Sequence, residues 1–118
     1  MTKKIYHLST CDTCKRILKE LQPPNDVTLQ DIKTVSISPA QLEGMKNLSG
    51  SYESLFSKRA RMYKERGLAD KNLTEEDYKS LILEHYTFLK RPVILLDNQI
   101  FIGNSIKEIA AAKDALNP

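Results

Sequence analysis

Two cysteines separated by two residues stand where a strand pattern changes into a helix pattern. Residues 4–8 alternate apolar and polar positions, as a strand does when one face is buried. After Cys14, apolar residues recur at helical spacing up to Pro23 and Pro24, which end a helix. The sequence therefore predicts a strand, then a helix that begins at or just after Cys11.

The rest of the chain follows an order of elements that defines a fold class. Apolar positions between residues 27 and 32 predict a second strand and complete a βαβ unit with a parallel pair. The other predicted elements are helices over 38–48 and 52–66, a helix from Thr74, a hairpin over 93–102, and a helix over 105–116 that opens with a Ser105–Glu108 capping box. The order βαβ, three helices, ββα predicts an α/β protein with a four-stranded mixed sheet and a helical insertion, which is the pattern of the thioredoxin fold.

The length of 118 residues predicts one domain, residues 1–118, because domains most often have roughly 100–150 residues. Within it, residues 1–35 and 87–118 are expected to form the thioredoxin-like core, and residues 36–86 the insertion. The apolar fraction of 41% is enough for a core without disulfide or metal cross-links.

Composition and charge exclude several classes of protein. The longest apolar run, residues 93–96, is far shorter than the ~20 residues of a membrane helix. The N-terminus has no apolar region typical of an export signal, and a net charge of +3 is too small to indicate direct nucleic-acid binding. We therefore expect a cytoplasmic protein with no membrane contact.

The cysteine pair carries the clearest chemical signal. Cys11 is expected at a helix N-terminus, where unpaired N–H groups and the helix dipole stabilise a thiolate, and a thiolate is the nucleophilic form of cysteine. Cys14 lies three residues later on the same helix face, within disulfide reach. We predict that Cys11 attacks a substrate and that Cys14 resolves the product.

Two other interpretations of the cysteines stay open. Both could be small buried apolar residues without reactivity. A zinc site would need two further ligands, and the two histidines, His7 and His85, are not spaced as a pair; no metal is expected. His7 within its strand and His85 on an apolar helix stripe are interpreted as structural residues.

Cationic residues supply candidates for anion binding. In the predicted helix 52–66, Arg59 shares the stripe of Tyr52 and Tyr63, so we expect it to point inward toward an anionic partner. The alternative is a solvated cationic face. Thr13 and Lys15, one turn or less after Cys11, are the other candidate anion-binding residues.

Arg91 and Pro92 stand immediately before the second pair of strands. In thioredoxin-type folds the proline at this place is usually cis and packs beside the active cysteine. Pro92 is therefore predicted to be cis, and Arg91 to lie near Cys11, where it would steady an anion or a thiolate. The alternative is an ordinary proline at a strand start with a surface arginine.

Over nearly its whole length the chain resembles the arsenate reductase-like family, which also contains the Spx-type transcriptional regulators. The resemblance is carried by Ile5-Tyr6-His7, by residues 9–15 around the cysteines, by Ser57-Lys58-Arg59, by Gly67-Leu68, and by residues 89–94 and Ile102-Gly103.

The resemblance implies a thioredoxin-like fold with a helical insert. In the arsenate reductases, the cysteine that matches Cys11 attacks the arsenic oxyanion, three arginines bind the charged oxygens, and glutathione with glutaredoxin completes the cycle. Arg91 matches one of these arginines, whereas Ser57 and Gly103 occupy the places of the other two. Arg59 matches an arginine of the Spx-like members.

Taken together, these features predict a thiol-dependent oxidoreductase that acts on a small oxyanion, a thiol or a disulfide. It needs no bound cofactor and takes electrons from a redox partner, either glutathione with glutaredoxin or thioredoxin. The alternative is an Spx-like redox switch, in which a non-catalytic Cys-x-x-Cys controls binding to the RNA polymerase α subunit. A third interpretation is an interaction module with inert cysteines.

Overall fold

The computed structural model describes residues 2–118, which form two compact units. Unit 1 comprises Met1–Val35 and Arg91–Pro118, and unit 2 comprises Ser36–Lys90. Residues 87–90, which we expected in the core, belong to unit 2. They are held there because the Ser57 N–H donates to the Phe88 carbonyl at 2.7 Å and the Lys90 N–H donates to the Leu55 carbonyl at 2.8 Å.

Unit 1 contains a four-stranded sheet with the order β2-β1-β3-β4. Its strands are β1 (Lys3–His7), β2 (Thr28–Asp31), β3 (Val93–Leu96) and β4 (Gln99–Ile102). The β1–β2 pair is parallel, and the β1–β3 and β3–β4 pairs are antiparallel. The predicted four-stranded mixed sheet of an α/β protein is therefore confirmed.

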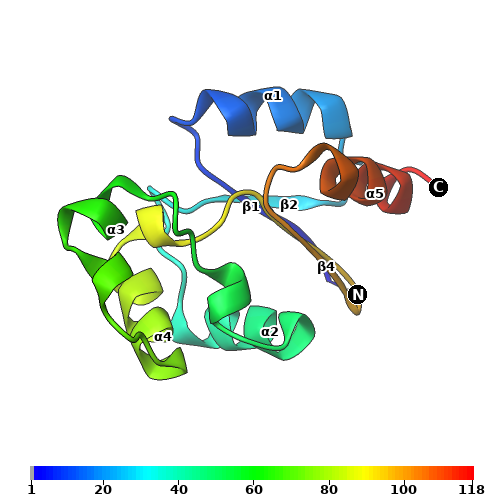
Figure 1. Ribbon diagram of the computed structural model, residues 1–118. Coiled ribbons are helices and arrows are strands. Elements are labelled where there is room, and N and C mark those ends of the chain that lie inside the picture. Colours follow the sequence, from blue (N-terminus) through cyan, green and yellow to red (C-terminus); the bar gives the residue numbers. More distant parts are fainter. Residues whose placement is uncertain (1) are drawn as a thin grey trace. The chain divides into compact units, whose positions relative to one another are not determined.

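Helices α1 (Asp12–Leu21) and α5 (Ile106–Leu116) cover one face of this sheet (Figure 1). Ile5 and Ile94 of the sheet pack against Ile17 of α1 and Ile109 and Ala112 of α5. On α5 the core residues Ile109 and Ala112 are three positions apart, which is a spacing that places side chains on one face of a helix.

The segments around Cys11, Asp31 and Pro92 lie at the same end of the sheet. β1 and β4 both run opposite to β3, and β2 runs parallel to β1. The chain therefore leaves β1 toward Cys11 at the same sheet end where β2 finishes at Asp31 and where β3 begins after Pro92. The Gly103 N–H donates to the Pro92 carbonyl at 2.9 Å, so the end of β4 is fixed there too.

Unit 2 is helical. It contains α2 (Pro39–Ser49), α3 (Arg61–Glu65) and α4 (Glu75–Glu84) with three short 3₁₀ turns, η1 (Glu53–Leu55), η2 (Leu68–Asp70) and η3 (Tyr86–Phe88). Its core includes Phe56, whose ring contacts Tyr63, Tyr78 and Phe88 at centroid distances of 5.7, 4.8 and 5.4 Å. No helix within residues 2–118 is long and apolar enough to cross a membrane.

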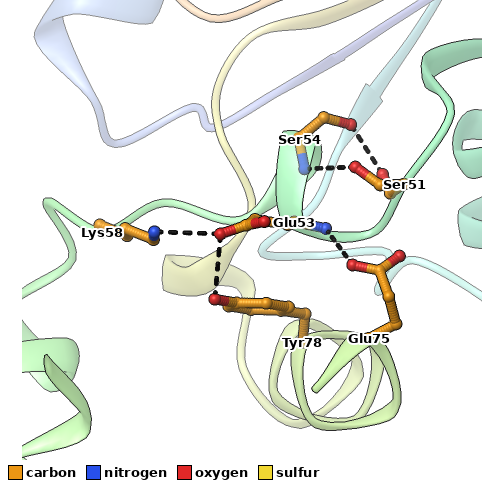
Figure 2. A network of polar contacts seen from close by, with 6 residues as sticks. All are labelled: Ser51, Glu53, Ser54, Lys58, Glu75 and Tyr78. Atoms are coloured by element: carbon orange, nitrogen blue, oxygen red, sulfur yellow. Dashed lines mark hydrogen bonds and ion pairs between the residues drawn. The ribbon is translucent and has the colours of Figure 1, made fainter. Parts of the chain in front are cut away.

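A polar network supports the η1 turn (Figure 2). The Glu75 carboxylate accepts hydrogen bonds from the N–H groups of Tyr52 at 2.7 Å and Glu53 at 3.1 Å. The Glu53 carboxylate in turn accepts from the Lys58 ammonium at 3.1 Å and from the Tyr78 hydroxyl at 3.2 Å. Side chains therefore satisfy backbone donors at the turn, which a short helix cannot satisfy internally.

The predicted helix over residues 52–66 is wrong. The chain forms η1, then an isolated antiparallel bridge between Phe56 and Leu89, and only later the short helix α3. Pairing with a segment far away in sequence replaces the helical bonds, so Phe56 faces the aromatic core from an extended backbone. His85 likewise lies just beyond α4 as its C-cap, with Nδ1 accepting from the Thr87 N–H at 3.0 Å.

Candidate active site

The site starts from Cys11, which is the N-cap of α1. Its backbone is extended, at φ −95° and ψ 117°, and its carbonyl accepts the first helical hydrogen bond from the Lys15 N–H at 3.1 Å. Its own N–H donates to the Leu8 carbonyl at 3.1 Å and closes the turn that follows β1. The helix thus begins just after Cys11, as predicted.

Several weak donors stabilise the Cys11 thiolate. Burial by itself raises the pKa of the Cys11 thiol, but interactions with the Cys14 N–H, the Cys14 thiol and the Thr13 N–H, together with the charge of Arg91, bring it below its ordinary value. Cys11 makes no full side-chain cap bond, so no single donor dominates. A half-buried sulfur with a lowered pKa is both reactive and accessible.

Cys14 has the opposite character. Its side chain is 1% exposed, and this burial raises the pKa of its thiol. The backbone of Leu8 and the charge of Arg91 act against that increase, whereas the neighbouring Cys11 sulfur adds to it. Cys14 therefore stays a thiol under conditions where Cys11 is a thiolate, and it can donate a hydrogen bond to that thiolate.

Arg91 and Pro92 complete the site in unit 1. The Arg91–Pro92 peptide bond is cis, which is the isomer that the thioredoxin-type fold implies. Pro92 is buried and Arg91 is half-buried, and the charge of Arg91 acts on both sulfurs. The structure thus brings together Cys11, Cys14 and Arg91, at the start of β3 and the start of α1.

The three candidate anion-binding residues have different surroundings. Thr13 is half-buried and directs its N–H to Cys11. Lys15 is exposed on α1. Arg59 is exposed in a turn of unit 2, between η1 and α3. The predicted inward orientation of Arg59 is wrong, because it depended on a helix that does not form.

Two residues beside the site were not predicted from the sequence to have a functional role. Asp31, the last residue of β2, accepts hydrogen bonds from Ser9, which lies between β1 and Cys11. His7, the last residue of β1, keeps a buried Nδ1 atom without a hydrogen-bond partner. Among residues 2–118 no group of three or more His, Cys, Asp or Glu side chains is placed to hold a metal ion.

The fold and the cysteine pair define the class of protein. The chain has a thioredoxin-like α/β fold with two cysteines in sequence Cys-x-x-Cys at the N-terminus of the first helix. A family model confirms the resemblance in sequence: residues 6–112 match the ArsC family. The chain belongs to the ArsC family.

Individual relatives are similar over most of their lengths. The chain is 31% identical over 110 residues to an uncharacterised protein of Haemophilus influenzae, covering 92% of this chain and 96% of the relative. It is 25% identical over 112 residues to an arsenate reductase of Neisseria meningitidis, covering 92% and 95%. It is also 25% identical over 108 residues to the global transcriptional regulator Spx 2 of Bacillus anthracis, covering 89% and 82%.

A solved structure supports the fold independently. The arsenate reductase from Vibrio cholerae superposes with a TM-score of 0.76, covering 95% of this chain and 98% of that chain, at 20% sequence identity. At this identity the likeness concerns the fold and not the reaction. The relatives of this chain include both an arsenate reductase and a transcriptional regulator.

Proposed function

We propose that this chain is a cytoplasmic thiol-dependent oxidoreductase in which Cys11 is the nucleophile and Cys14 the resolving cysteine. The observation that supports this role is the opposite pKa shift of two neighbouring thiols, lowered at Cys11 and raised at Cys14. Attack needs a thiolate, and resolution needs a second thiol that stays protonated until the first has reacted.

With a disulfide substrate, the Cys11 thiolate attacks one sulfur and forms a mixed disulfide, and the other substrate sulfur leaves as a thiolate. Cys14 then loses its proton and attacks Cys11. The Cys11–Cys14 disulfide forms, and the second substrate thiolate leaves. Two electrons pass from the cysteine pair to the substrate, and an external dithiol restores the pair.

With an oxyanion such as arsenate, Cys11 bonds to arsenic(V) and an oxygen leaves as water. When Cys14 attacks Cys11, the sulfur–arsenic bond breaks and its electron pair reduces the product to arsenic(III). Arg91 is half-buried beside the sulfurs and would balance the charge of such an anion. Thr13 and Lys15 remain candidates for further contacts with the anion.

The presence of two thiols favours a thioredoxin-like electron donor over glutathione with glutaredoxin. A single reactive cysteine would require glutathione with glutaredoxin, whereas a chain that forms its own disulfide is suited to a thioredoxin-like donor. The proposed cycle uses no bound cofactor.

The test is arsenate-dependent consumption of NADPH, measured separately with glutathione–glutaredoxin and with thioredoxin regeneration. We expect Cys11→Ser to abolish turnover in both systems. Cys14→Ser should abolish turnover with thioredoxin and accumulate a mixed disulfide at Cys11 when a disulfide substrate replaces arsenate. Turnover that survives Cys11→Ser, or no reduction of either substrate class, would reject the proposal.

A second candidate is supported by the similarity to the regulator Spx 2. In this alternative the same cysteine pair is a redox switch, and the partner is the RNA polymerase α subunit. It predicts a complex with that subunit whose affinity changes on oxidation and that Cys14→Ser makes insensitive to oxidation. Binding that ignores the redox state, or no binding, would exclude it.

A further inference from the structure

The turn that carries Cys11 is attached to the neighbouring strand by one carboxylate. The Ser9 hydroxyl donates to Oδ2 of Asp31 at 2.6 Å, and the Ser9 N–H donates to Oδ1 at 3.2 Å. Asp31 also accepts from the Lys33 N–H at 3.2 Å, which fixes the carboxylate itself. Both carboxylate oxygens are therefore used, and the Ser9 backbone and side chain are both held.

Asp31 is itself placed by the sheet. It is the register partner of His7 in the parallel β1–β2 pair, and the next residue, Ile32, donates its N–H to the His7 carbonyl at 2.9 Å. His7 is also an ionisable neighbour of Asp31 on β1. The hydrogen bonds from Ser9 hold the pKa of Asp31 below its ordinary value, so the carboxylate stays ionised at neutral pH.

Ser9 lies inside the turn that determines where Cys11 begins the helix. The Cys11 N–H closes this turn on the Leu8 carbonyl, and the Cys11 carbonyl accepts the first hydrogen bond of α1. The Cys11 sulfur is stabilised by several weak donors, among them the Thr13 and Cys14 N–H groups. Such contacts depend on the exact direction of the N-cap side chain, since hydrogen bonds weaken steeply with misalignment.

We propose that Asp31 is a positioning residue for the Cys11 nucleophile. Its two hydrogen bonds from Ser9 fix the turn before α1, and this turn orients the Cys11 sulfur toward the N–H donors of α1. The inference rests on the proposed role of Cys11 as nucleophile. Asp31 acts through Ser9 and the turn, not by contact with the reacting sulfur or with a substrate.

The direction in which Asp31 variants shift the pKa of Cys11 distinguishes a positioning role from a purely electrostatic one. If Asp31 acted only through its negative charge, removing the charge would favour the Cys11 thiolate and lower the pKa of Cys11. If Asp31 acts by positioning, loss of its hydrogen bonds weakens the donors to Cys11 and raises that pKa. Asparagine has the same shape as aspartate, can accept a hydrogen bond from the Ser9 N–H and can donate one to the Ser9 hydroxyl. The Asp31→Asn variant therefore removes the charge and keeps both hydrogen bonds to Ser9.

The experiment measures iodoacetamide alkylation of Cys11 between pH 5 and pH 10, resolved from Cys14 by peptide mass spectrometry. The groups that titrate or carry charge beside Cys11 are Cys14 and Arg91, and they are the same in all variants. We expect Asp31→Ala to raise the apparent pKa of Cys11 by about 0.5–1 unit and to slow alkylation at pH 7 about three- to tenfold. Ser9→Ala, which keeps the backbone hydrogen bond to Asp31, should raise the apparent pKa of Cys11 by less. Asp31→Asn should have the wild-type alkylation profile.

The matched control is Asp26→Ala. Asp26 is also a carboxylate of unit 1 with a short bond, 2.7 Å to the Lys3 ammonium, but it precedes β2 at the opposite end of the sheet. Its removal should leave the Cys11 profile unchanged. An unchanged profile in Asp31→Ala, a lowered pKa in both Asp31 variants, or an equal shift in Asp26→Ala would overturn the inference.

These outcomes are independent of turnover. Alkylation needs no substrate, so the positioning role can fail while the enzyme still reduces arsenate or a disulfide. It can also hold when no turnover is found, which would reject the proposed function alone. If Asp31→Ala does not fold, Ser9→Ala and Asp31→Asn still test the positioning role. The role requires that Ser9→Ala raise the pKa of Cys11 and that Asp31→Asn not raise it.

Discussion

At the scale of single residues, two thiols of the same chemical type acquire opposite pKa shifts from their immediate surroundings. Cys11 stands just outside the first turn of α1, where N–H groups have no helical partner and favour an anion. Cys14 is one turn further in and almost fully buried, and burial disfavours an anion. Two thiols with only two residues between them therefore have pKa values shifted in opposite directions.

Arg91 is the charged side chain that favours the anionic form of both thiols, which leads to a residue-scale prediction. Arg91→Ala should raise the pKa of Cys11 and slow its alkylation at pH 7 about three- to tenfold, because a nearby positive charge is lost. Arg91→Lys should retain most of the rate, since it keeps the charge. Arg16→Ala, which removes an exposed cation of α1, is the control and should stay within about twofold of the wild type.

At the scale of elements, sequence signals between near neighbours predicted helices and strands well. The predictions failed where residues far apart in the sequence pair with one another. The N-caps Ser38 and Thr74 mark the starts of α2 and α4 as predicted, because capping is a contact between near neighbours. At Ser105 only half of the predicted capping box forms, since the Glu108 carboxylate accepts from the Ile102 N–H of β4 instead. The Glu108 side chain therefore binds a backbone group outside the four residues of the capping box.

The same cause explains the error around Arg59. The apolar spacing there is helical, but the backbone bridge between Phe56 and Leu89 joins segments more than thirty residues apart. Periodicity within a window contains no information about such a bridge. The cysteine pair and Arg91–Pro92 were predictable because they adjoin strong local elements, whereas Asp31 acts on Ser9 across a strand pair and could not be identified from the sequence.

The capping box of α2 gives an element-scale prediction. The Ser38 hydroxyl accepts from the Gln41 N–H and the Gln41 side chain accepts from the Ser38 N–H, both at 3.1 Å. Ser38→Ala should lower the free energy of unfolding by about 1 kcal/mol, because a helix N–H loses its partner. Urea titration followed by circular dichroism measures it, with the exposed Ser36→Ala as control. Equal stability of the two variants would contradict the assignment.

At the scale of the whole molecule, the two units differ in what their sequences specify. The architecture of unit 1 follows from strand and helix periodicities and from the parallel β1–β2 pair, because the general rules for crossover connections leave few topologies for such a unit. Unit 2 depends on side-chain bonds such as those of Glu53 and Glu75 and on one aromatic cluster around Phe56. Both units share one electrostatic feature, which is a set of exposed or half-buried carboxylates that accept hydrogen bonds.

These carboxylates predict how stability depends on pH. Hydrogen bonds to neighbouring groups hold their pKa values below the ordinary range; they are Asp26 and Asp31 in unit 1 and Glu53, Asp77 and Glu84 in unit 2. Because each folded pKa lies below the unfolded one, the native protein binds fewer protons than the unfolded chain on acidification. The stabilisation is therefore complete above the unfolded carboxyl pKa of about 4 and is lost as pH falls through the lower folded values.

We expect the urea midpoint to be highest above about pH 5 and to fall steadily below about pH 4. The variant Asp77→Asn tests the origin of the effect, because asparagine can still accept the Thr74 N–H bond of 2.8 Å but cannot titrate. Its stability should lie below the wild type at pH 7 and approach it at pH 3, where the wild-type carboxyl is becoming protonated. A midpoint that rises on acidification, or a difference between the two proteins that does not shrink, would show that these hydrogen-bonded carboxylates do not govern the acid response.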